Sequence, residues 1–249
     1  MPPAILITGA ARRIGATLAR AFGQAGWHVV IHHRASHAEA QALAATLPSA
    51  EAVECDLLDG EAAVAMVEAL AARLPDWRML VNCAAVFEHD GADAIEPGVF
   101  ARAMRVNAET PARMAQAFLA SARALGGRRV IQFTDMKLRN PNPDFFSYTM
   151  AKHALDATVR MLAMAQANPQ DRVYGLAPGA MLPSFDQVPE EHEISGRMNL
   201  LRRLTDPDEL ADAALFLSEG WLASGETIFV DSGQHLLAQP RDVLYLARP

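Results

Sequence analysis

Three ionisable residues in one short stretch have the types and spacing to do proton chemistry. Tyr148 and Lys152 form a Y-x-x-x-K pattern, and Asp135 precedes the tyrosine by thirteen residues. Positions four apart share one face of a helix, so the lysine ammonium would stand near the phenol and bring its pKa towards the working range. The pattern therefore predicts a tunable acid. A chance pattern on a solvated helix face is the alternative, and the rest of the chain must decide between them.

The composition limits the class of protein. The chain has 249 residues, 51% of them hydrophobic, and a formal net charge of -7, which suits one globular domain and argues against a nucleic-acid surface. The two cysteines, Cys55 and Cys83, show no disulfide or metal spacing, and we expect both to be reduced. No secretory leader follows Met1, and no apolar stretch approaches the roughly 18 residues that a membrane span needs. We expect a soluble cytoplasmic protein.

The elements that position the three residues alternate between strand and helix. Most predicted strands are continuous apolar runs, which is typical of a parallel sheet covered by helices on both faces. The sequence therefore predicts a single α/β domain with a doubly wound Rossmann sheet of about seven strands. A helix after Pro97 is expected to break near 107–111. The predicted strands span 4–8, 27–33, 52–55, 79–83, 129–133, 172–177 and 227–230.

A glycine turn between the first strand and the first helix predicts a dinucleotide site. The turn reads Thr8-Gly9-Ala10-Ala11-Arg12-Arg13-Ile14-Gly15. Gly9 permits a tight turn, Gly15 permits close approach of helix to sheet, and the helix N-terminus offers amide donors to a pyrophosphate.

The end of the second strand indicates which nicotinamide cofactor binds. A carboxylate there would hold the ribose hydroxyls, but the chain has His33 and Arg34, with Ser36 following. These donors suit a 2'-phosphate, so NADPH is favoured over NADH. The sequence predicts no metal site, because no acidic or sulfur partner lies at ligand spacing from the histidines. Asp56 ends the third strand, where it could reach an adenine amine or begin a turn.

These motifs together resemble the short-chain dehydrogenase/reductase family over nearly the full length of the chain. The likeness rests on T-G-x-x-x-x-x-G, the run Asn82-Cys83-Ala84-Ala85, Asn107, Y-x-x-x-K and Pro178-Gly179. The resemblance implies a Rossmann fold, Tyr148 as acid, Lys152 on the nicotinamide ribose and Asn107 in a proton relay. It also implies a cofactor-contacting set of Gly9, Arg12, Arg13, Ile14, Gly15, His33, Arg34, Ser36, Asp56, Leu57, Asn82, Ala84, Lys152, Pro178 and Gly179.

Two departures from the family pattern look like its pteridine reductase branch, which includes bacterial dihydromonapterin reductases. Arg13 stands where the family has its middle glycine, and Asp135 stands where it has a serine. The resemblance implies that Arg13 contacts cofactor phosphate and pterin, that Asp135 works with Tyr148, and that Phe87 stacks on the pterin. The plain alternatives are a turn-initiating Asp135, a core Phe87, a solvated Arg13 and a capping Asn107.

The residues and the resemblance lead to one function and two alternatives. A carboxylate suits the N–H donors of a pterin, whereas it would repel the oxyanion of a carbonyl reduction. We therefore expect NADPH-dependent reduction of a C=N bond in a dihydropterin or dihydrofolate-like substrate, with proton delivery by Tyr148 and Asp135. The alternatives are a general carbonyl reductase and a catalytically idle NADPH-binding interaction protein.

Two segments carry further expectations. The irregular segment 181–199 follows the sixth strand, where it is either a substrate lid or an ordinary surface excursion. The resemblance places the tail 238–249 at a tetramer interface through Leu244, Tyr245 and Leu246, and a loose tail is the alternative. The expected partners are a small pterin-like molecule and further copies of the chain, with neither nucleic acid nor membrane.

Overall fold

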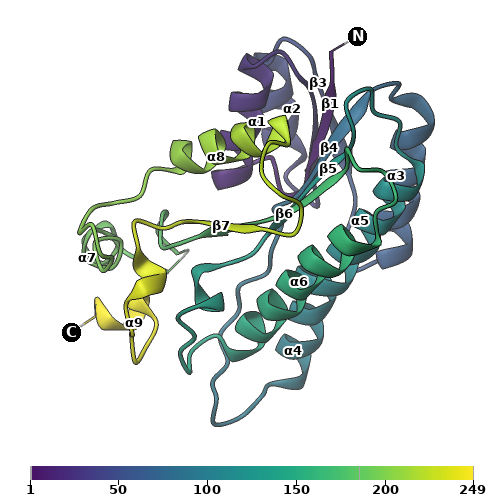
Figure 1. Cartoon of the computed structure of the whole chain (residues 1–249). Helices are drawn as coiled ribbons and strands as arrows, with labels where there is room; N and C mark the ends of the chain where they lie inside the picture. Colours follow the sequence, from purple (N-terminus) through teal and green to yellow (C-terminus); the bar gives the residue numbers. More distant parts are fainter. Residues whose placement is uncertain (1, 185, 249) are drawn as a thin grey trace.

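Seven parallel strands form the centre of the protein in the computed structural model, which describes residues 2–184 and 186–248 (Figure 1). Their order is β3-β2-β1-β4-β5-β6-β7, and each neighbouring pair is parallel. This confirms the predicted doubly wound sheet. The strands are β1 (Ala4–Ile7), β2 (His28–His33), β3 (Ala50–Glu54), β4 (Trp77–Asn82), β5 (Arg129–Phe133), β6 (Arg172–Pro178) and β7 (Thr227–Val230).

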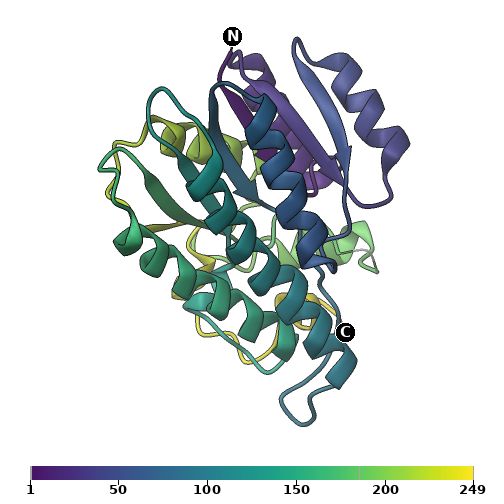
Figure 2. The same ribbon diagram turned by 90° about the vertical axis from the view of Figure 1, so that its right-hand side faces the viewer.

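Helices cover both faces of the sheet. On one face α1 packs against α8, and Figure 1 shows α2 on the same side. On the other face α3, α5 and α6 run side by side in front of the strands, as Figure 2 shows. The helices are α1 (Arg13–Gln24), α2 (His37–Thr46), α3 (Gly60–Arg73), α4 (Pro97–Met104), α5 (Thr110–Ser121), α6 (Phe146–Ala165), α7 (Pro189–Ser195), α8 (Pro207–Glu219) and α9 (Val243–Leu246).

The continuous apolar strands are buried on both faces. In β1, Leu6 belongs to the core beneath α3 and α5, whereas its neighbours Ile5 and Ile7 belong to the core beneath α1 and α8. All three are fully buried. Successive side chains of a strand point to opposite faces, so each face of β1 needs apolar residues. This is why the strands read as unbroken apolar runs.

The strand order reverses at β1, which lies between β2 and β4. Ligands of such folds bind outside the carboxyl ends of the strands at this point, so the crevice beside β1 and β4 is where a site is expected. The loops after β1, β4, β5 and β6 all open there. These loops carry most of the candidate site residues that the sequence analysis identified.

Two irregular regions differ in detail from the prediction. The expected helix break near 107–111 is a π-helical turn over Arg105–Glu109, which joins α4 to α5 without a loop. The segment 181–199 is not wholly irregular, because it contains α7. None of the described helices combines the length and the apolar character that crossing a bilayer requires.

Candidate active site

Asp135, Tyr148 and Lys152 form one cluster at the carboxyl end of β5. Tyr148 lies in the first turn of α6, and its hydroxyl donates to Asp135 Oδ2 across 2.7 Å. Lys152 lies one turn further along and donates from Nζ to the carbonyl of Phe133 across 2.6 Å. Its Nζ is 5.6 Å from the centre of the Tyr148 ring. The helical spacing therefore brings the three side chains together as expected.

The proton-binding properties of this cluster follow from its burial. Burial and then the Asp135 carboxylate raise the pKa of Tyr148 well above its usual value. Burial also raises the pKa of Asp135 and lowers the pKa of Lys152 to about 8. Lys152 alone would lower the pKa of Tyr148, and the sequence could not balance this effect against that of Asp135. In the structure burial and the Asp135 carboxylate prevail, so the pKa rises. The phenol therefore keeps its proton at neutral pH.

Asn107 lies outside the described cavity lining and holds the backbone of the segment after β4. It is fully buried in the π-helical turn, a feature often found at functional sites. Its Oδ1 accepts from the Val86 N–H and its Nδ2 donates to the Val86 carbonyl, both across 2.8 Å. These bonds fix the backbone that leads into Phe87. Asn107 thus positions the segment after β4, and the proton relay stays a prediction.

Phe87 lies against Tyr148 in an aromatic cluster. Its ring centre is 3.9 Å from that of Phe145, in a stacked arrangement, and 4.7 Å from that of Tyr148, edge to face. Phe145 stacks in turn on Tyr245, with the centres 6.0 Å apart. Stacked and edge-to-face pairs are the favoured aromatic geometries. Sequence reasoning found Phe87, missed Phe145, and named Tyr245 only as an interface residue; the fold alone brings both of these rings to Phe87.

The turn after β1 fits a dinucleotide pyrophosphate. Gly9 has φ +66°, and a Cβ there would lie 3.0 Å from Ala84 Cα. A Cβ on Gly15 would collide with the carbonyl oxygen of Gly9. Within the described chain, α1 has no side-chain cap at Arg12 and no acid in its first turn, so its amides are left for an anionic ligand.

Arg13 occupies a backbone conformation that glycine favours. Its φ is +54°, in the left-handed region that costs a non-glycine residue roughly 1 kcal/mol. The turn thus keeps the geometry of the family's glycine although the residue is arginine. The Arg13 guanidinium donates from Nη2 to the carbonyl of Pro183 across 2.9 Å. Arg13 therefore joins the phosphate turn to the segment 181–199.

His32 ties the turn to the neighbouring strands. The Gly9 N–H donates to His32 Nδ1 across 3.1 Å, so Nε2 carries the proton and donates to the Cys55 carbonyl across 3.0 Å. Burial lowers the pKa of His32 to about 4. The imidazole is therefore neutral at pH 7 and bridges β1, β2 and β3. Sequence reasoning missed this residue, whose signal was a polar side chain inside an apolar strand.

The end of β2 offers donors for a phosphate. His33, Arg34 and Ser36 line the cavity, and Ser36 precedes α2 without a side-chain capping bond to described residues. Asp56 Oδ1 accepts from the Leu58 N–H across 3.0 Å, which supports its reading as a turn residue. The sequence places no acidic residue at ligand spacing from the histidines, but the fold brings one next to them. Glu54 of β3 lies beside them.

One cavity of about 680 Å³ joins these parts. Four of the predicted residues lie outside the described lining. These four are Asp56, Leu57, Asn82 and Asn107. Asn82 donates from Nδ2 to the Pro111 carbonyl across 3.1 Å and to Gln132 Oε1 across 2.9 Å, which makes it a structural link. The predicted residues in the lining are Gly9, Arg12, Arg13, Ile14, Gly15, His33, Arg34, Ser36, Ala84, Phe87, Asp135, Tyr148, Lys152, Pro178 and Gly179.

Comparison with known proteins assigns the chain to a family. The family described as "Enoyl-(Acyl carrier protein) reductase" matches residues 9–235. The chain belongs to the short-chain dehydrogenase/reductase family. It is 29% identical to "Pteridine reductase 1" of Leishmania tarentolae, over 94% of this chain and 96% of that protein. It is 30% identical to "7alpha-hydroxysteroid dehydrogenase" of Escherichia coli (strain K12), over 92% of each.

A solved structure resembles the whole fold. "FolM Alternative dihydrofolate reductase 1" from Brucella canis, complexed with NADP, superimposes with a TM-score of 0.89. It is 32% identical, and the match covers 96% of each chain. The fold described above is therefore that of a short-chain oxidoreductase.

The C-terminal tail forms a wall of the cavity. Lys137 donates from Nζ to Asn142 Oδ1 across 2.9 Å, and the same Nζ lies 2.8 Å from Asp242 Oδ2 in an ion pair that is almost wholly buried. Val243 and Leu244 follow in the lining. Leu244 is only 4% exposed, so it packs within its own chain, as Tyr245 does on Phe145. The tetramer stays a prediction, and residue 249 of the tail lies outside the described residues.

The segment 181–199 is tied to this tail. Arg248 donates to Asp186 Oδ2 across 3.0 Å and to Glu191 Oε1 across 3.3 Å, which joins α9 to α7 (Figure 1). Met181, Leu182, Ser184, Gln187 and Ser195 line the cavity. Closure of this segment over a substrate stays a prediction, and its residue 185 lies outside the described residues.

The neutral His32 predicts a particular pH dependence of stability. Its folded-state pKa of about 4 lies below the ordinary 6.5. The stability that the neutral His32 gives to the fold is therefore fully present above pH 6.5 and is lost as the pH falls towards 4. The loss approaches about 3 kcal/mol. His32→Gln keeps an acceptor and a donor but does not titrate. Urea unfolding at several pH values is expected to show a shallower acid loss in this variant, and parallel curves would contradict the role of His32.

The buried ion pair of Lys137 and Asp242 predicts a large loss of stability when one charge is removed. Asp242→Asn leaves the Lys137 ammonium without its counter-charge, at a cost of about 3 kcal/mol. Asp186→Asn is the matched control, because Asp186 pairs with Arg248 at the surface, where the loss is below about 1 kcal/mol. Denaturant unfolding measures both. Equal losses would show that the buried pair does not anchor the tail.

Proposed function

We propose that the protein is an NADPH-dependent pteridine reductase acting on a dihydropterin or dihydrofolate-like substrate. The observation that carries this proposal is the hydrogen bond from Tyr148 to Asp135, 2.7 Å long, in the wall of the cavity. A carboxylate accepts hydrogen bonds from the ring N–H and amine groups of a pterin. Beside the developing oxyanion of a ketone reduction the same carboxylate would be repulsive.

The identities of the relatives do not by themselves decide between pterin and ketone. A pteridine reductase and a hydroxysteroid dehydrogenase match at 29% and 30%. The choice rests instead on Asp135, which stands where a ketone reductase of this family is expected to have a neutral serine. Phe87 supports it further, because it puts an aromatic ring in the cavity lining, and aromatic rings stack on flat heterocycles.

The cofactor proposal rests on the other end of the cavity. The uncapped helix N-terminus of α1 suits a pyrophosphate, and Arg34 and Ser36 suit a 2'-phosphate. The similar protein from Brucella canis is complexed with NADP. When bound, NADPH supplies a hydride. Lys152, fixed by the Phe133 carbonyl, is the residue we assign to the nicotinamide ribose.

The catalytic cluster supplies the proton that accompanies the hydride. Reduction of a C=N bond adds hydride to carbon and a proton to nitrogen. Tyr148 holds that proton at neutral pH because burial and Asp135 raise its pKa. Donation to the ring nitrogen leaves negative charge beside Asp135, which the Lys152 ammonium offsets until a solvent proton restores the phenol. Asp135 meanwhile holds the substrate N–H groups.

The substrate class is tested by Asp135→Ser. NADPH oxidation is followed by absorbance with dihydropterins, dihydrofolate and simple ketones. We expect the wild type to turn over pterins, and Asp135→Ser to lose at least about 100-fold in pterin kcat/KM without a loss on ketones. The exposed Asp93→Ser is the control, and Tyr148→Phe should nearly abolish all turnover. Ketone reduction by a wild type that is inactive on pterins would overturn the proposal.

The cofactor preference is tested by Arg34→Ala. Loss of one charged contact to a 2'-phosphate is expected to weaken NADPH binding about tenfold or more and to leave NADH binding nearly unchanged. Arg160→Ala, an exposed arginine of α6, is the matched control. Fluorescence titration of both cofactors gives the two affinities. Equal losses of NADPH and NADH affinity would remove Arg34 from the phosphate site.

A further inference from the structure

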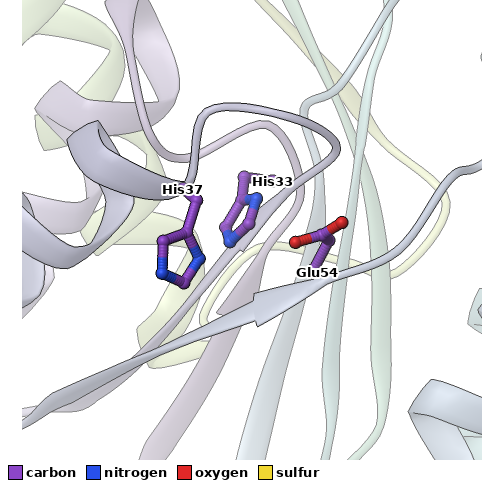
Figure 3. A group of neighbouring side chains, drawn as sticks. All are labelled: His33, His37 and Glu54. Carbon is purple, nitrogen blue, oxygen red and sulfur yellow. The ribbon is translucent and has the colours of Figure 1, made fainter.

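Three potential metal ligands meet at the edge of the sheet, outside the catalytic cluster. Figure 3 shows His33, His37 and Glu54 with their side chains close together. Each offers one ligand atom, and the three atoms lie within 4.8 Å of one another. In sequence only the two histidines are near neighbours. The carboxylate comes from another strand, which is why sequence reasoning excluded a metal.

The fold explains why these side chains converge. His33 ends β2 and Glu54 ends β3, and the two residues are directly paired in the parallel register. The chain then turns through residues 34–36, and His37 begins α2. The two imidazole rings lie 5.5 Å apart at 76°. The cluster is therefore set by strand register and by the start of a helix, so it does not depend on one mobile loop.

The three side chains have no competing partners among the residues that the structure describes. His33 is 3% exposed, and its buried Nδ1 has no hydrogen-bond partner there. Such an orphaned buried nitrogen is uncommon and calls for an explanation. His37 and Glu54 are exposed and make no side-chain hydrogen bond or ion pair within residues 2–184 and 186–248. One buried and two exposed ligands can thus close on an ion that enters from solvent.

We propose that His33, His37 and Glu54 bind a divalent transition-metal ion of the Zn²⁺ type. Two imidazoles and one carboxylate form a recognised Zn²⁺ ligand set, which leaves a fourth position open for water or an anion. Ligand atoms around tetrahedral Zn²⁺ lie about 3.4 Å apart. The observed separation is somewhat larger, and rotation of the exposed His37 and Glu54 side chains closes it.

The ion has a consequence for the cofactor, and this part rests on the proposed function. Two of its ligands, His33 and His37, flank the loop that carries Arg34 and Ser36. Metal binding fastens this loop to β3 and adds positive charge beside it. A preorganised, more positive loop binds a 2'-phosphate more tightly. The ion therefore favours NADPH over NADH, with His33 serving as metal ligand and the phosphate contacts coming from Arg34 and Ser36.

The site is tested by titrating the full chain with Zn²⁺ in a calorimeter and with Co²⁺ in a spectrophotometer. We expect one ion per chain and a tetrahedral Co²⁺ absorption band. His37→Ala and Glu54→Gln, both surface changes that spare the fold, should each weaken binding at least about tenfold. His153→Ala, an exposed histidine of α6, is the matched control. Absence of a stoichiometric site, or equal binding by all variants, overturns the proposal.

The coupling is tested separately by measuring NADPH and NADH affinity with and without Zn²⁺. The expected result is a selective gain for NADPH of about tenfold or more that His37→Ala abolishes. Zn²⁺ binding without this gain keeps the metal site and overturns its link to the cofactor. Weaker NADPH binding in His37→Ala without any Zn²⁺ binding shows instead that the cluster serves the phosphate directly, which overturns the metal site.

Discussion

The hydrogen bond between Tyr148 and Asp135 is the interaction on which the chemistry of the cavity depends. It places a phenol against a carboxylate in a buried setting. Burial raises the pKa of both groups, and the carboxylate raises the pKa of Tyr148 further. Its geometry is fixed by the surrounding chain. Asp135 Oδ1 accepts from the Lys137 N–H across 2.9 Å, and Lys137 is in turn held by Asp242. The acid is therefore supported by the far end of the sequence.

The turn after β1 depends on close backbone approach. Gly9 allows the turn after β1 to lie against Ala84 in the loop after β4, and Gly15 allows α1 to begin close against Gly9. His32 fastens the turn to β2 and β3. A neutral imidazole suits this place because one nitrogen accepts and the other donates. Arg13 accepts an unfavourable φ in the same turn and contacts the segment 181–199. Backbone strain at such a site is consistent with a functional role.

The two ends of the cavity are mechanically connected. Arg13 joins the phosphate turn to Pro183, and Arg248 joins Asp186 to the tail. Through Lys137, the tail then reaches the loop that carries Asp135. The tail and the segment 181–199 thus form one part of the cavity wall, while the loops at the carboxyl ends of the strands form most of the rest.

The sequence by itself determined the sheet and most of the cavity lining. Unbroken apolar runs, the glycine turn and the four-residue spacing of Tyr148 and Lys152 are local patterns, and local patterns survive folding because they follow the period of one strand or one helix. The family resemblance gave Asn82 as a cofactor contact, whereas in the structure it lies outside the described cavity lining and bonds to Pro111 and Gln132.

Only the tertiary structure decided those properties of the site that depend on which side chains lie close together. The upward direction of the Tyr148 pKa follows from burial and from Asp135 lying nearer to the hydroxyl than the Lys152 ammonium. The pairing of Lys137 with Asp242 and of His33 with Glu54 follows from the path of the tail and from strand register. Register and chain path are set by the packing of the whole core, and no local period encodes them.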